Sequence, residues 1–315
     1  MQKKITIIGA GSVGATTAFA LLARGAASEV VLIDINTEKA LGEALDIKQA
    51  TPFLDNCDIY AGSYADAVNS DVVIITSGIG RKPGQTRLEL VQTNVGIIKS
   101  IANEIVRYAP NAIYILVANP VDILTYAFLK YTGLPKNQVM GTGTVLDTIR
   151  LRTRLAEIYH VNKQQVHANV LGEHGDTSFV AWSTATIAGV PLDEYRDSIA
   201  SAYTIPNEYK REDVETYVRK SGGKIISRKG CTVYGIAMTS THIVKSLGGS
   251  AETALTVSSL HEGEYGISDV CLSSLSLVDR TGVRSIITQK LSDEELRKLH
   301  ESAEALKSVI KSVTF

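Results

Sequence analysis

The sequence predicts an α/β fold, in which a doubly wound parallel sheet is followed by an α+β second domain. Up to about residue 140, short apolar runs are separated by helical stretches, and polar residues do not alternate within the runs. Such runs are typical of parallel strands buried on both faces. After about residue 143, helices mix with shorter strand-like pieces. Since 315 residues are too many for one small core, we expect two domains, residues 1–142 and 143–315.

The first half contains the elements of the parallel sheet. Its expected strands are runs rich in β-branched residues: ITIIG at 5–9, EVVLIDI at 29–35, DVVIITSG at 71–78 and AIYILVANP at 112–120. Helices are expected at 13–25, which ends at a glycine, and at 37–50. Strands that alternate with helices in this way form a doubly wound sheet with right-handed crossovers.

The second half is expected to mix strands and helices. VHANVLG at 166–172 and VCLSSLSLVD at 270–279 are the strand-like pieces. The final helix is expected at 292–313, where Ser292 and Glu295 have the spacing of a capping box and apolar residues recur at helical intervals.

Composition excludes several classes of function. The net charge of -1 and the lack of a basic tail argue against a nucleic-acid partner. No run of eighteen apolar residues could span a membrane, and the apolar run at the N-terminus is too short for a signal peptide. Cys57, Cys231 and Cys271 form no C-x-x-C pair, so we predict no disulfide framework and no metal site. A cytoplasmic location is expected, because free cysteines suit a reducing compartment.

A dinucleotide site is predicted at the first turn of the chain. Gly9, Gly11 and Gly14 form a G-x-G-x-x-G motif between a strand and a helix, and Asp34 ends the next strand. In a Rossmann-type fold these glycines allow a tight turn, a close approach to pyrophosphate and close helix–strand packing. Asp34 would accept hydrogen bonds from a ribose and repel a 2′-phosphate, which favours NAD over NADP. A flavin site and a turn that merely begins a helix are the alternatives.

The motif makes residues 1–142 the expected NAD-binding domain and leaves 143–315 as the catalytic, substrate-binding domain. Beyond the glycines and Asp34, the predicted cofactor-binding residues are Val13, Lys39, Gly78, Val117 and Asn119. Asn119 ends a parallel strand, where ligands of such sheets bind.

A second cluster carries candidate acid–base chemistry. His174 lies in LGEHGDTS, just after a strand-like run, and Asp147 lies in GTGTVLDTIRLR. A carboxylate beside an imidazole orients it and stabilises its protonated form. Arg150 follows Asp147 by three residues, so both share one face of a helix. Its guanidinium could bind a carboxylate through two parallel hydrogen bonds. The blander interpretation is a structural histidine.

The stretch SGIGRKPGQTR at 77–87 predicts a flap that closes over an anion. It combines three glycines and a proline with the cations Arg81, Lys82 and Arg87. Closing such a segment would exclude water from a ligand site.

Over essentially its whole length the sequence resembles the lactate/malate dehydrogenase superfamily, and most closely its bacterial L-lactate dehydrogenases. The matching segments include KPGQTRLELVQTN, VANPVDILTY, LGEHGDTSFVAWS and KGCTVYGIAM. The resemblance implies that His174 exchanges a proton with the substrate while NADH delivers hydride, and that Asp147 holds His174. It further implies roles for four residues: Arg150 binds the substrate carboxylate, Arg87 polarises the carbonyl, Asn119 positions substrate and nicotinamide, and Thr232 lines the pocket.

Arg81 leaves the substrate open between pyruvate and oxaloacetate. In the family that the sequence resembles, lactate dehydrogenases often carry Gln at this position and malate dehydrogenases carry Arg. An arginine that enters a closing pocket favours a second carboxylate, because an unpaired buried charge is costly. Glu173, Trp182 and Thr232 resemble the lactate enzymes instead. We therefore expect an L-lactate dehydrogenase, with a malate dehydrogenase or a broader L-2-hydroxy-acid dehydrogenase as the alternatives.

Arg152 and His167 suggest a regulatory site. In allosteric bacterial lactate dehydrogenases, matching positions from two subunits bind fructose 1,6-bisphosphate, and the resemblance also implies a homotetramer. The blander account is an arginine on a helix surface and a histidine on an exposed strand.

Two other classes of protein remain as alternatives. NAD-dependent glycoside hydrolases need metal-ligating Cys and His near the nicotinamide, and the three cysteines match no such pattern. A non-catalytic NAD-binding protein would leave the combination of Asp147, Arg150, His174 and Arg87 unexplained.

Overall fold

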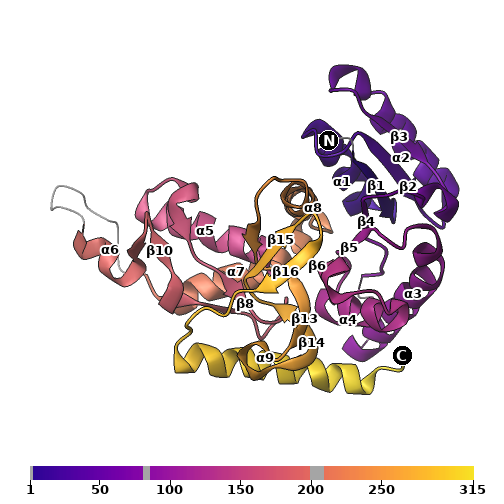
Figure 1. The fold of residues 1–315 in the computed structure, drawn as a ribbon. Helices are drawn as coiled ribbons and strands as arrows, with labels where there is room; N and C mark the ends of the chain where they lie inside the picture. Colours follow the sequence, from indigo (N-terminus) through magenta and orange to yellow (C-terminus); the bar gives the residue numbers. More distant parts are fainter. Residues whose placement is uncertain (1–2, 81–85, 199–208) are drawn as a thin grey trace.

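The protein is built on one eight-stranded sheet (Figure 1). The structure, a computed structural model, describes residues 3–80, 86–198 and 209–315. Six strands of the sheet are parallel and follow the order β3-β2-β1-β4-β5-β6. They are β1 (Lys4–Ile8), β2 (Glu29–Ile33), β3 (Asp58–Ala61), β4 (Val72–Ile75), β5 (Ile113–Leu116) and β6 (Val139–Gly141). This order reverses between β1 and β4, as in a Rossmann fold, which confirms the predicted doubly wound sheet.

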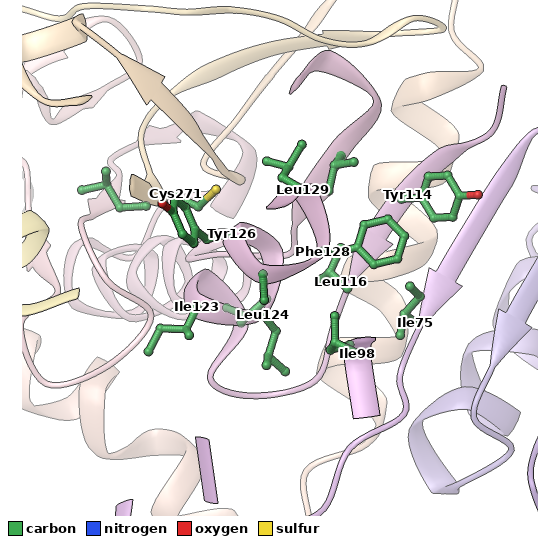
Figure 2. Packing of buried hydrophobic residues seen from close by; sticks show 14 of the residues in the cluster. Ile75, Ile98, Tyr114, Leu116, Ile123, Leu124, Tyr126, Phe128, Leu129 and Cys271 are labelled. Atoms are coloured by element: carbon green, nitrogen blue, oxygen red, sulfur yellow. The ribbon is translucent and has the colours of Figure 1, made fainter. Parts of the chain in front are cut away.

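Four helices accompany these strands and enclose the core. They are α1 (Ser12–Ala23), α2 (Thr37–Lys48), α3 (Arg87–Tyr108) and α4 (Val121–Thr132). All residues of β4 and β5 are buried, as the unbroken apolar runs predict. Helix α4 lies deepest, since its residues 121–129 are all buried. Figure 2 shows Phe128 of α4 facing Tyr114 of β5, with ring centroids 4.8 Å apart.

The same sheet continues into the second half of the chain. Strands β13 (Ser258–Glu262) and β14 (Ser268–Ser273) pair antiparallel with each other. Strand β13 joins the parallel part through Ser258, which lies opposite Gly141 of β6. One sheet therefore contains strands from both halves of the chain, before and after residue 143, where the sequence pattern changes.

The remaining elements form the α+β part. Its helices are α5 (Val145–Tyr159), α6 (Leu192–Ser198), α7 (Arg211–Lys229), α8 (Tyr234–Leu247) and α9 (Asp293–Ser312). Its small sheets contain β7 (Val166–His167), β8 (Val170–Leu171), β9 (Phe179–Val180), β10 (Thr186–Ile187), β11 (Val190–Pro191), β12 (Thr253–Leu255), β15 (Ser276–Asp279) and β16 (Gly282–Ile286). Helix α9 has the expected capping box of Ser292 and Glu295, and Figure 1 shows it running beneath both halves.

Two expected strands are each divided into two. Residues 166–172 form β7 and β8, which belong to different sheets, and between them Ala168 and Asn169 accept hydrogen bonds from Arg152. Residues 270–279 form parts of β14 and β15, again in different sheets. Across the described ranges, no helix combines the length and the apolar character needed to cross a bilayer.

Candidate active site

The glycine loop between β1 and α1 has the shape that a dinucleotide phosphate needs. Gly9 has φ +112°, and a Cβ there would lie 2.6 Å from Thr76 Oγ1. A Cβ on Gly14 would lie 1.8 Å from the carbonyl oxygen of Gly9, so helix and strand pack too closely for a side chain. A Cβ on Gly11 would meet nothing within 4 Å. Two glycines thus permit the turn, and the third leaves space at the N-terminus of α1, where backbone N–H groups attract anions.

Asp34 lies beside this loop, just after β2. Its Oδ2 accepts a hydrogen bond from the backbone N–H of Ala10 at 2.6 Å, and its Oδ1 accepts one from Asn36 at 2.9 Å. These donors fix a negative charge next to the phosphate turn. A carboxylate at this point suits a ribose hydroxyl and repels a 2′-phosphate.

The other residues predicted to bind the cofactor are spread along the same edge of the sheet. Val13 belongs to α1, the exposed Lys39 belongs to α2, Gly78 follows β4, and Val117 and Asn119 follow β5. A Cβ on Gly78 would lie 2.9 Å from that of Ala118, so the two segments approach closely here.

His174, Asp147 and Arg150 form one hydrogen-bonded group. His174 Nδ1 lies 2.6 Å from Asp147 Oδ2, and Arg150 Nη1 donates to Asp147 Oδ1 at 2.9 Å. The contact of Arg150 with Asp147 follows from their i, i+3 spacing in α5, whereas His174 comes from the loop after β8. With Nδ1 committed to Asp147, Nε2 is the ring nitrogen left to face a ligand.

The charges of this group favour a protonated imidazole. Burial alone lowers the pKa of His174, but the carboxylates of Asp147 and Asp122 outweigh burial and hold that pKa above its usual value. Burial likewise raises the pKa of Asp147, and the charges of His174 and Arg150 more than reverse this, so its pKa lies below the usual range. An ionised carboxylate against an imidazole makes a proton donor that operates near neutral pH.

A cavity of about 230 Å³ brings the predicted residues together. Asn119 and Val117 enter it from the first half of the chain, and Asp147, Arg150, His174 and Thr232 enter it from the second half. The cavity thus lies between the two halves, beyond the end of β5, where the sequence predicts that Asn119 meets a ligand. Its size suits a small organic acid.

Three features around this cavity have no counterpart in the sequence prediction. Arg219 of α7 is a second lining cation, and it donates to the carbonyl of Ser178 at 3.2 Å. Gly222 and Gly223 line the same wall. Asn94 of α3 is buried and donates to the carbonyl oxygens of Ile79 and Asn119 at 3.1 and 2.8 Å. Arg219 and Gly222 are three residues apart on one helix, so the sequence could have predicted that they share a face. Nothing in the sequence singles out Asn94.

Comparison with known proteins assigns the family. The sequence matches the NAD binding domain of lactate/malate dehydrogenases over residues 3–141 and their alpha/beta C-terminal domain over residues 144–314. The chain belongs to the lactate/malate dehydrogenase family. Its cofactor is NAD, and the glycine loop and Asp34 fit that cofactor.

Relatives match over nearly the full length. An L-lactate dehydrogenase of Acetivibrio thermocellus is 45% identical over 99% of this chain and 97% of the relative. An L-lactate dehydrogenase of Clostridium perfringens is 47% identical over 98% of this chain and 96% of the relative. The crystal structure of a minor L-lactate dehydrogenase from Enterococcus mundtii, in a ligands-bound form, has a TM-score of 0.94 and 39% identity, covering 100% of this chain and 99% of that one.

The flap of this lactate/malate dehydrogenase is described only at its ends. Arg81 lies outside the described residues, and so does the side chain of Arg87. Helix α3 begins at Arg87 because Thr86 and Glu89 form a capping box. Arg87 is therefore the first residue of a helix, whereas the sequence predicts it as the last residue of the flap.

Arg152 and His167 lie near each other at the start of the second half. Arg152 Nε donates to the carbonyl of Ala168 at 3.0 Å, and its Nη2 donates to Asn169 Oδ1 at 3.0 Å. Burial lowers the pKa of Arg152, and His167 on β7 is exposed. The arginine thus supports the backbone directly after the histidine.

Proposed function

We propose that this protein is an NAD-dependent L-lactate dehydrogenase, which reduces pyruvate and oxidises lactate in the reverse direction. The observation that carries the proposal is the contact of His174 with Asp147, at 2.6 Å, in a cavity that Arg150 also lines. The relatives named L-lactate dehydrogenase, at 45% and 47% identity, favour pyruvate over oxaloacetate. The broader class, an NAD-dependent 2-hydroxy-acid dehydrogenase, follows from the family.

The geometry of the cavity supports the proposed roles. When bound, NADH would supply the hydride that reduces the carbonyl carbon. His174 gives its Nε2 proton to the carbonyl oxygen, so that pyruvate becomes lactate, and takes the proton back in the reverse direction. Asp147 holds the ring and stabilises its positive charge. Arg150 binds the substrate carboxylate through the guanidinium edge that Asp147 leaves free.

The remaining predicted residues complete the site. Asn119 and Thr232 line the cavity and position the substrate. Gly9, Gly11, Gly14 and Asp34 hold the dinucleotide, with Val13, Lys39, Gly78 and Val117 as further contacts. Arg87 and Arg81 lie outside the described side chains; as the resemblance implies, Arg87 would polarise the carbonyl and Arg81 would decide between substrates. In this proposal residues 1–142 form the NAD-binding domain, which also contributes Arg81, Arg87 and Asn119, and residues 143–315 form the catalytic domain.

Steady-state rates with two substrates test the proposal. The kcat/KM for NADH oxidation is compared between pyruvate and oxaloacetate. We expect pyruvate to be preferred by at least about a hundredfold, which corresponds to roughly 2.7 kcal/mol of transition-state binding. A preference for oxaloacetate would assign Arg81 to a second carboxylate and make the protein a malate dehydrogenase.

We propose further that the enzyme is a cytoplasmic homotetramer activated by fructose 1,6-bisphosphate. Arg152 and His167 of two subunits would bind the phosphates, and the free cysteines suit a reducing compartment. Activation should appear as a lower apparent KM for pyruvate, because a ligand that binds the active arrangement shifts the population towards it. The variant His167→Ala should lose the response to fructose 1,6-bisphosphate and keep the basal rate. An unchanged saturation curve in the parent protein would exclude the site.

A further inference from the structure

A second buried carboxylate lies beside His174 and has no part in the mechanism above. Asp122 is only 2% exposed. Its Oδ2 accepts a hydrogen bond from the backbone N–H of His174 at 2.8 Å, and its Oδ1 accepts one from Ser258 Oγ at 2.6 Å. These bonds join residues that are 52 and 136 positions apart in the chain. A buried carboxylate is costly unless its oxygens are bonded in this way.

His174 is therefore held from two directions. Asp147 binds its ring nitrogen Nδ1, and Asp122 binds its backbone N–H. The contact of Nδ1 with Asp147 fixes the distance between the imidazole ring and α5, but by itself it would not hold the loop that carries His174. The backbone contact fixes the loop itself, so the two together determine where Nε2 points.

Asp122 provides a rigid anchor for this loop. It occupies the first turn of α4, where the helix dipole favours a negative charge. Figure 2 shows its neighbours Ile123 and Leu124 within the hydrophobic core, and both are buried. The opposite oxygen is bound by Ser258, which lies at the junction of β6 and β13. The anchor and the residues that hold it are thus all buried.

We propose that Asp122 is a positioning residue for His174, holding the loop backbone while Asp147 holds the ring. The proposal rests on the proposed role of His174 as proton donor. It links Asn119, three residues before Asp122, to the proton donor across the cleft. Small displacements of a reacting group are costly, since about 1 Å can reduce a rate about a hundredfold.

The negative charge of Asp122 raises the pKa of His174, in addition to the positioning effect of its hydrogen bonds. Burial raises the pKa of Asp122 to about 6, against the lowering effect of its bonds to Ser258 and His174. Among the described residues, the titratable groups that interact with it are His174, Glu173 and Cys271. Burial raises the pKa of the Cys271 thiol well above its usual value, so Cys271 stays neutral. At pH 7 Asp122 is largely ionised and adds to the effect of Asp147 on His174.

Two substitutions separate position from charge. Asp122→Ala removes both hydrogen bonds. Asp122→Asn keeps an acceptor for His174 and removes only the charge, because the hydroxyl of Ser258 can accept from the new amide. The matched control is Thr125→Val, which removes a buried hydroxyl one turn further along α4, where it donates to the carbonyl of Val121 at 2.7 Å.

We expect Asp122→Ala to lower kcat/KM for pyruvate about 10- to 100-fold, with the Kd of NADH unchanged within twofold. Asp122→Asn should restore most of the rate at pH 6 and should lower the pKa of His174, measured by NMR titration of the ring. Thr125→Val should change neither quantity. The proposal is overturned if Asp122→Ala retains full activity, or if NADH binding falls in parallel with the rate, since Asp122 would then act on the cofactor loop.

The NMR titration keeps this proposal separate from the proposed function. If the parent protein reduces neither pyruvate nor oxaloacetate, the proposed function fails, and the His174 titration in Asp122→Asn still measures the coupling. If Asp122→Ala does not fold, Ser258→Ala takes its place, because it removes the hydrogen bond that holds Asp122 Oδ1. An unchanged kcat/KM for pyruvate in Ser258→Ala would then overturn the proposal.

Discussion

At the residue scale, the direction of the reaction depends on the proton of His174. Reduction of pyruvate requires the imidazolium, and oxidation of lactate requires the neutral ring. The pKa of His174 is raised, so kcat/KM for reduction should be level at low pH and should fall tenfold per pH unit above that raised value. Oxidation should show the opposite slope.

Asp147→Asn tests the source of this shift. The substitution removes the carboxylate that raises the pKa of His174 most, and burial, which lowers it, remains. The falling limb of the reduction profile should therefore move to lower pH, and kcat at pH 7 should drop by roughly 10²-fold or more. Initial rates between pH 5 and 9 measure both effects. A limb that stays in place would assign the titration to another group.

The same residues show what the sequence could predict. Asp147 and Arg150 lie in one helix, so their spacing predicts their contact, and the motif around His174 predicts a cleft position. Asp122, Asn94 and Arg219 were not predicted. Their roles depend on contacts between segments that only the folded chain brings together, such as the contact of Asp122 with His174 across 52 positions.

At the element scale, helix α7 contains a glycine pair that its own packing does not require. A Cβ on Gly222 would lie 4.0 Å from Arg150 Nη2, which is an ordinary contact, and a Cβ on Gly223 would meet nothing within 4 Å. Each glycine inside a helix costs about 1 kcal/mol relative to alanine. Since both line the cavity, we attribute them to the width of the substrate pocket.

Gly222→Ala should therefore stabilise the protein and narrow its substrate range. We expect about 1 kcal/mol of added stability, seen as a rise in Tm of roughly 2–4 °C. The kcat/KM for a branched 2-oxo acid should fall relative to that for pyruvate. Gly42→Ala in α2 is the matched control, because a Cβ there meets nothing within 4 Å and Gly42 does not line the cavity. An equal substrate ratio in both variants would contradict the assignment.

Strand boundaries show a limit of sequence patterns at this scale. The parallel strands β1, β2, β4 and β5 were predicted because four adjacent buried residues allow few alternatives. Strands β3 and β6 were not predicted, since β3 has one buried residue and β6 has three residues in all. Residues 270–279 were predicted as one strand because serines and apolar residues continue without a break. Between β14 and β15, Ser274 Oγ lies 2.9 Å from His261 Nε2, and the carbonyl of Ser274 accepts a hydrogen bond from Ser276 Oγ at 3.0 Å. His261 belongs to β13, so the first of these contacts forms only when β13 and β14 are paired.

At the scale of the whole molecule, the cavity is held by one continuous framework. The eight-stranded sheet crosses from the NAD-binding half into the second half through Gly141 and Ser258. Helix α9 extends under both, and beyond its end Thr314 exchanges two hydrogen bonds with Gln92 of α3. The walls of the cleft are therefore fixed relative to each other.

This framework carries a cost in stability at Asp122, which pH can measure. The pKa of Asp122 is about 6 in the folded protein and near 3.8 in the unfolded chain, so the folded state binds this proton more tightly. Well below pH 3.8 both states are protonated and the group has no effect. As the pH rises to 6 the folded state loses up to about 3 kcal/mol relative to a protein without this carboxyl group.

Asp122→Asn should remove that cost. Its free energy of unfolding, measured in urea at each pH, should gain on the parent between pH 4 and 6 and keep a constant advantage above pH 7. A higher stability of the variant, together with its altered His174, would mean that the protein retains the carboxylate for catalysis. If the variant is less stable than the parent at pH 7, the hydrogen bonds to Ser258 and His174 depend on the charge, and Asp122 stabilises the fold as well as the site.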